Sequence, residues 1–197
     1  MALGPDSLTW RYAGDWRGMV IALWAGSMQN MHPGLGAAVE QHSQFFTERW
    51  QRLYRSMYPI HGMVFDGPRA IETAREVRGY HNTIKGVDGR GRSYHALDPD
   101  TFFWAHSTFY VGATLVAEYF MGGLTDAQRR TMYDEYVELY RQYGMSMRPV
   151  PATYDDFRVY WDRMCAQELE VNKATLDVLD VAELPKPHFL PWLPDTV

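Results

Sequence analysis

The sequence predicts an all-α protein, with residues 1–197 forming a single globular bundle of about seven to nine helices. Apolar and aromatic residues recur at helical spacing in one segment after another. No segment shows the sustained alternation with β-branched residues that is typical of strands. Hydrophobic residues make up 46% of the chain and charged residues 22%, which is ordinary for a globular domain of this length.

The first half of the chain is divided by prolines and glycines. Asp6 or Ser7 can cap a short first turn. The segment DWRGMVIALWAGSMQNM is apolar almost all round, so we expect a buried helix there. Pro59 should end or kink a later helix, and the glycine-rich run GVDGRGRS predicts a turn without regular structure. The expected helices cover residues 15–31, 33–42, 44–64 and 67–86.

The second half opens on the strongest local signal. Asp98 is a favoured N-cap and Pro99 suits the first helical position, so a long helix should run from there to Gly122 and Gly123. Thr125 and Gln128 have the spacing of a capping box, which predicts the start of the next helix. The remaining expectations are a helix that ends at Gly144, a helix from Thr153, a weaker helix around 173–183, and an extended Pro-rich tail from about 184.

Composition excludes several classes of function. The net charge is −5 and the basic residues are scattered, so we expect no nucleic-acid partner. The single cysteine, Cys165, excludes an internal disulfide and a cysteine-based zinc site; its apolar helical context favours a buried structural thiol. The apolar run 19–26 is too short to span a bilayer, and no signal peptide is evident. These features predict a cytoplasmic protein without a transmembrane segment.

An ionisable ring stands in the most aromatic stretch of the sequence, FFWAHSTFY. On a helix, His106 shares a face with Phe102, Phe103, Phe109 and Tyr110. A neutral imidazole between aromatic rings suits a ligand of a haem iron, and it equally suits a core histidine bonded to a backbone carbonyl. Aromatic residues form 15% of the chain, which fits either a large flat or oily ligand or simply a well-filled core.

A second candidate cluster lies on the expected helix 68–85. Arg78 and His81 are three residues apart, which places a guanidinium beside an imidazole. An inward-facing arginine needs an anionic partner, such as a haem propionate, another carboxylate or a bound oxidant. The alternative is a polar face that is open to solvent.

Motifs in a fixed order carry a family resemblance. They read GPDSLTWR, MHPGLGAAVEQHS, REVRGYHNTIKG, YHALDPDTFFWAHSTF, DEYVELYRQYG and PATYDDFRVYW. This order resembles the oxygenase family of the bacterial latex-clearing protein (rubber oxygenase) and the fungal MpaB-type oxygenase of mycophenolic acid biosynthesis. The resemblance runs from about Gly4 to Pro194, and its most specific parts are residues 78–86 and 98–108.

The resemblance implies an all-α fold distantly related to the globins, with haem b as cofactor. His106 matches the axial histidine that holds the iron. Arg78 matches an arginine on the distal side, where His81 and Asn82 fall among the polar residues. Phe102, Phe103, Phe109 and Tyr110 would then pack against the cofactor.

We therefore expect a haem-dependent oxygenase or hydroxylase. It would act on an apolar small-molecule substrate with molecular oxygen, and an electron donor can be required. In this hypothesis His106 binds iron, and Arg78 and His81 act as catalytic residues. The alternative is a haem-binding or small-ligand-binding module without turnover, such as a carrier or sensor. A third hypothesis is a helical protein that keeps only the fold.

Overall fold

Helices make up most of the part that the computed structural model describes, which is residues 3–43 and 49–180. The predicted Pro-rich tail lies outside these residues. Within them the elements are α1 (Leu8–Ala13), α2 (Gly18–Asn30), α3 (Pro33–His42), α4 (Arg49–Phe65), a 3₁₀ turn (Gly67–Arg69), α5 (Ala70–Gly79), β1 (Lys85–Val87), β2 (Ser93–His95), α6 (Pro99–Phe120), α7 (Asp126–Gln142), α8 (Tyr154–Arg163), a π-helical turn (Met164–Glu168) and α9 (Lys173–Leu179). The predicted all-α class is confirmed, with one small hairpin added.

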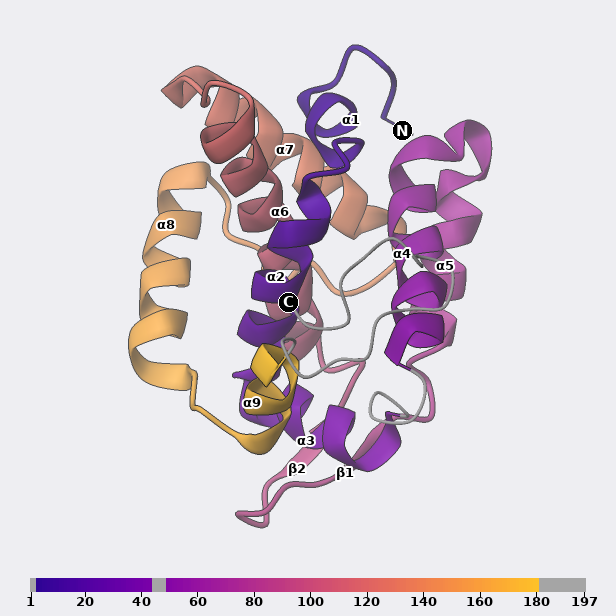
Figure 1. Ribbon diagram of the computed structural model, residues 1–197, viewed down its shortest axis with the longest axis vertical. Coiled ribbons are helices and arrows are strands. Elements are labelled where there is room, and N and C mark those ends of the chain that lie inside the picture. Colours follow the sequence, from indigo (N-terminus) through magenta and orange to yellow (C-terminus); the bar gives the residue numbers. More distant parts are fainter. Residues whose placement is uncertain (1–2, 44–48, 181–197) are drawn as a thin grey trace, which may run out of the picture.

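Helix α6 is the axis of the bundle. It packs against α1, α2 and α7, while α4 and α5 stand on one side and α8 on the other (Figure 1). More than half of its 22 residues are buried, including Trp104 at 0% exposure. The hairpin and α3 lie together at one end of the molecule (Figure 1). The candidate histidine therefore sits on the most enclosed helix of the fold.

The ends of α6 and α7 follow the sequence signals. The Asp98 carboxylate accepts hydrogen bonds from the backbone N–H groups of Asp100 and Thr101, which have no partner inside the helix. After α6 the chain turns at two glycines with φ of +83° and +84°, a region that favours glycine. Thr125 and Gln128 form the predicted reciprocal capping box at the start of α7.

The region after α5 differs from the prediction. The helix expected to reach Gly86 ends at Gly79, and an antiparallel hairpin follows, in which Gly86 pairs with Tyr94. A side chain at position 86 would come within 2.7 Å of the Tyr94 hydroxyl, so the glycine permits close strand contact. The Asp88 carboxylate accepts from the backbone N–H groups of Arg90 and Arg92, which orders the glycine-rich loop. Strands of three residues are too short to show a period in the sequence.

Three further expectations need correction. Helix α2 is not buried all round, because Trp16 beside it and Val20 within it are 79% and 62% exposed. Helix α4 does not end at Pro59, the first of the two outcomes expected there, but continues through it at the loss of one helical hydrogen bond. Cys165 is exposed rather than buried. It lies in the π-helical turn after α8, where the wider winding changes the face that each residue occupies.

Candidate functional site

His106 is buried at the contact between α6 and α7. Its side chain is 3% exposed, and its Nε2 lies 2.7 Å from the backbone oxygen of Tyr136. Three tyrosine rings of the α7 segment surround the imidazole, with ring centroids 5.3 to 5.7 Å from it; they belong to Tyr136, Tyr140 and Tyr143. Both alternatives for His106, an iron ligand and a core histidine, require a buried ring, and the structure confirms that burial.

The protonation state of His106 follows from this environment. Burial lowers the pKa of His106 to about 4, and the hydrogen bond to Tyr136 opposes that shift only in part. The ring is therefore neutral near pH 7. Because a carbonyl oxygen only accepts, Nε2 must carry the proton and donate it, which leaves a lone pair on Nδ1. This buried Nδ1 has no hydrogen-bond partner in the structure.

A cavity adjoins the imidazole, and aromatic side chains dominate its lining as predicted. Its volume is about 10 Å³, the space of roughly one water molecule. No methionine is among its described lining residues. The lining residues are Phe103, His106, Ser107, Tyr110, Tyr133, Tyr136, Val137 and Phe157. As the side chains stand, this cavity holds no small molecule larger than water.

The four aromatic residues expected around His106 lie in different places. Phe103 and Tyr110 line the cavity, and the Tyr110 hydroxyl donates to the Arg129 backbone oxygen. Phe102 is buried but lies outside the lining of the cavity, and Phe109 is only half-buried at the edge of the core.

Sequence reasoning missed the tyrosines of α7. They recur at positions i, i+4 and i+7 in DEYVELYRQYG, a spacing that places three rings on one helix face. That signal was present in the sequence. Which residue they would face was not, because the contact with His106 spans about thirty positions of the chain. Burial raises the pKa of Tyr136 and Tyr143, so both phenols stay protonated.

The residues expected on the distal side do not contact His106. Arg78 is exposed near the end of α5, and its Nη1 lies 3.4 Å from the Gly144 backbone oxygen. His81 lies in the turn beyond α5. The prediction that Arg78 and His81 share one continuous helix face is therefore wrong. The Nδ1 atom of His81 is 2.7 Å from the Val77 backbone oxygen, and its ring meets Phe102 edge-on at 5.7 Å.

Arg78 and Asn82 instead line an open cleft between the end of α5 and the end of α7. Its volume is about 500 Å³, within the range of small-molecule sites. The other described lining residues are Arg75, Gly79, Tyr143 and Gly144. The cleft is thus cationic, whereas the cavity at His106 is aromatic and closed.

Tyr143 separates the two spaces. Its ring lies 5.7 Å from the His106 ring and 4.9 Å from Phe102, and the same residue lines the arginine cleft. Tyr143 is 2% exposed, so it closes the core at this point. A ligand could reach His106 from the cleft only if this ring moved.

Comparison with known protein families assigns the chain to one of them. The model of the family described as "ER-bound oxygenase mpaB/B'/Rubber oxygenase, catalytic domain" matches residues 10–197. The chain belongs to this family. It is therefore an oxygenase-type catalytic domain, as the motif order indicated. No curated protein and no solved structure matched the chain.

Two further observations concern the described residues only. No helix there is long and apolar enough to cross a membrane. No group of three or more His, Cys, Asp or Glu side chains is arranged to hold a metal ion.

The residues around His106 provide a ligand atom suited to haem b, but the space beside it is too small for the porphyrin. A metal-bound histidine usually donates its second ring N–H to a backbone carbonyl, and the bond from Nε2 to Tyr136 has this form. The buried, unpartnered Nδ1 is then the free donor atom. The adjoining space of about 10 Å³ is far below the size of a porphyrin, so binding requires the surrounding rings to move.

Proposed function

We propose that this oxygenase domain is a haem-dependent oxygenase or hydroxylase that acts on an apolar small molecule. The observation that carries the proposal is the neutral, buried His106 with its unpartnered Nδ1. Leaving a buried polar atom without a partner costs stability, and proteins usually keep such an atom for a reason. Because an oxygenase domain must activate molecular oxygen, we take ligation of an iron cofactor as the reason in this proposal.

In this proposal His106 holds the iron, and Tyr136 holds His106. The hydrogen bond from Nε2 to the Tyr136 carbonyl fixes the ring orientation and the tautomer. Phe103 and Tyr110 would pack against the cofactor, with Phe102 and Phe109 further out. When bound, haem b supplies the iron chemistry that activates molecular oxygen. Tyr136 and Tyr143 are the rings that would have to move to make room for haem.

Arg78, His81 and Asn82 are proposed to act from the side of the cleft. Arg78 and His81 would donate hydrogen bonds to a reacting oxygen atom where negative charge develops, which lowers a barrier more than a ground-state energy. Both are now separated from His106 by Phe102 and Tyr143. Their role therefore depends on the same movement that admits the cofactor.

A non-catalytic module that binds haem or another small ligand, such as a carrier or sensor, is the second candidate. The observation that favours it is the aromatic layer between His106 and the polar residues of the cleft. Turnover of an apolar substrate with oxygen and an electron donor distinguishes the two. Arg78→Ala should then keep haem and lose activity by roughly 10²- to 10³-fold, as when one oxyanion donor is removed.

A cytoplasmic location also belongs to the proposal. It is supported by the exposed Cys165 thiol, which suits a reducing compartment.

A haemin titration of the purified protein tests the proposed ligand. We expect a visible absorption band of bound haem that His106→Ala abolishes while the far-ultraviolet helical signal remains. His32→Ala is the matched control, because His32 is also largely buried with an unpartnered Nδ1 but does not line the cavity. An unchanged haem spectrum in His106→Ala would contradict the proposal and direct attention to His81.

A further inference from the structure

The arginine cleft contains a charge imbalance. Three arginines in the neighbouring segments are each paired with an acid: Arg69 with Glu72, Arg141 with Glu138 and Arg148 with Asp100. Arg75 and Arg78 make no ion pair with any described residue, and both line the cleft. Two guanidinium groups thus face one open space without an anion from the part of the chain that the structure describes.

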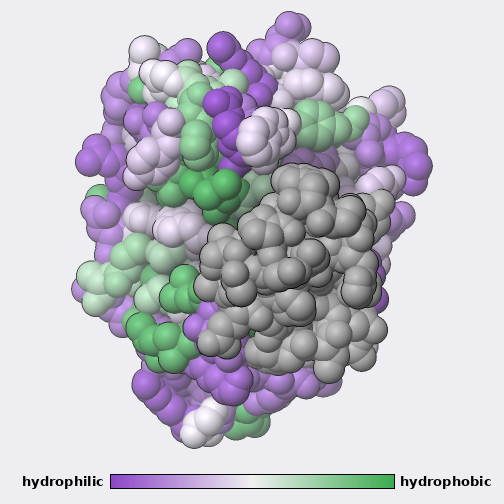
Figure 2. Space-filling view, in the orientation of Figure 1, coloured by the Kyte–Doolittle hydropathy of each residue, from purple (hydrophilic) through white to green (hydrophobic). Residues whose placement is uncertain are grey.

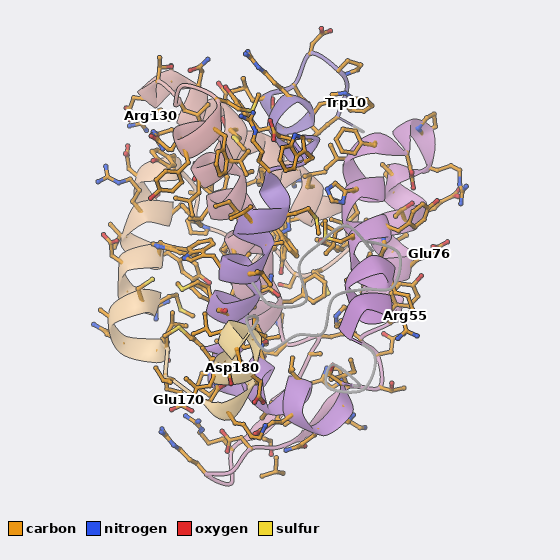
Figure 3. All side chains as sticks on the ribbon, viewed as in Figure 1. Trp10, Arg55, Glu76, Arg130, Glu170 and Asp180 are labelled. Carbon is orange, nitrogen blue, oxygen red and sulfur yellow. The ribbon has the colours of Figure 1, made fainter. Side chains whose placement is uncertain are left out.

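The rest of the described lining adds donors and no acids. The Asn82 side-chain amide is exposed and makes no hydrogen bond with the described residues. Glu76, the acid next to Arg75 along α5, is not among the lining residues and points outward from α5 (Figure 3). Gly79 and Gly144 also line the cleft and contribute no side chains to it.

The wall of the cleft nearest the core contains Tyr143. The residue is only 2% exposed and its ring packs inward against the rings of His106 and Phe102, so it presents a narrow aromatic surface to the cleft. A ligand that lies along this wall would place its charged end near Arg75 and Arg78 and its apolar part toward the buried histidine. The cleft therefore fits a molecule with two unlike ends better than a simple ion.

We propose that this cleft binds the carboxylate of an amphipathic ligand, whose apolar part lies against Tyr143. Guanidinium groups match a planar carboxylate through two parallel hydrogen bonds, and the Asn82 amide offers a third donor. The carboxylate can come from a substrate acid with an apolar chain or from the propionates of a porphyrin. As a statement about substrate the inference rests on the proposed function; as a statement about binding it stands on the cleft alone.

Calorimetric titration of the haem-free full chain with decanoate tests the inference, with decan-1-ol as the neutral probe of equal chain length. We expect decanoate to bind about 10-fold more tightly than the alcohol, the effect of a hydrogen bond to a charged group. Arg75→Gln/Arg78→Gln should abolish this preference. Arg158→Gln, which removes an exposed arginine from α8 on the other side of the bundle, should retain it (Figure 1).

A second pair of probes identifies the source of the carboxylate. Haemin and its dimethyl ester differ only in whether the propionates are free to ionise. Loss of a preference for haemin in Arg75→Gln/Arg78→Gln would assign the cleft to the propionates, and loss of the decanoate preference would assign it to a substrate acid. The inference is overturned if neither pair of probes shows a preference that depends on these arginines.

The two proposals fail separately. His106→Ala should keep the decanoate preference, because His106 does not line the cleft. Loss of haem binding in His106→Ala with intact decanoate binding would support both. Decanoate binding in a protein that never takes up haem would support the cleft and contradict the haem proposal.

Discussion

Tyr140 and Tyr143, two neighbours in the α7 tyrosine row, are both buried but border different surroundings. Tyr140 is fully buried, with its ring against Phe103 and His106. Three residues later Tyr143 borders an open, cationic cleft, and Gly144 is exposed. The residues proposed for ligation and for catalysis are therefore held by different forces. His106 is fixed by packing, whereas Arg78 is fixed by little more than one long hydrogen bond.

The surface repeats this contrast on a larger scale. Hydrophobic residues form separate patches on the viewed face, one of them over α2, and hydrophilic residues dominate its outer edges (Figure 2). Met19 and Val20 on α2, and Trp16 just before it, are exposed apolar residues. Packing that fixes α6 and α7 thus stops short of covering α2, just as it stops short of Arg78.

The largest expected effect is on Tyr140, the fully buried ring of the row. Tyr140→Ala should destabilise the protein by about 3–5 kcal/mol, because the cavity would remove contacts with several rings. Tyr80→Ala, which removes an exposed tyrosine just after α5, should change stability by less than about 0.5 kcal/mol. Urea unfolding of both variants measures the difference. Similar losses in the two would contradict the contrast between a packed and a loosely held region.

Titration of His106 gives the next largest effect. Its pKa is about 4 in the folded protein and has an ordinary value of 6.5, so the folded state resists a proton that the unfolded chain accepts. The stability contribution is complete above pH 6.5 and is lost as pH falls toward 4. The loss should be on the order of 3 kcal/mol.

The variant His106→Gln isolates this contribution from other groups. Its amide can still donate to the Tyr136 carbonyl but does not titrate, so its free energy of unfolding should fall less between pH 7 and pH 4. Asp15 and Asp155, whose pKa values are lowered by arginine partners, act in both proteins and cancel in the comparison. If the free energy of unfolding fell equally with pH in both proteins, His106 would lie in a more solvated environment than the structure shows.

The same contrast explains how much could be predicted. Helix α6 was predictable because local chemistry fixes both of its ends, through the Asp98 cap and the glycines after it. The burial of His106 followed from its aromatic neighbours. The early end of α5 and the hairpin could not be read, since their stability comes from contacts such as that of Gly86 with Tyr94. The volume beside His106 depends on the packing of α7, which no local pattern specifies.

The smallest expected effect lies at the boundary between the two regions. Gly144 has a φ of +68° just after α7, a conformation that costs an alanine roughly 1 kcal/mol. Gly144→Ala should therefore lower the free energy of unfolding by about that amount. Gly122→Ala should do the same, because Gly122 has a φ of +83° just beyond α6.

The two glycines differ in what surrounds them. An added methyl group at position 144 would lie 3.5 Å from Arg78 Nη1, whereas nothing lies within 4 Å at position 122. Gly144→Ala should thus weaken decanoate binding in the cleft by a few-fold, on the order of the loss of a weak hydrogen bond, and Gly122→Ala should leave it unchanged. Calorimetry on both variants measures this directly. Equal decanoate affinities would mean that Arg78 moves freely enough to ignore its neighbour, and that the cleft is set by Arg75 and Asn82 instead.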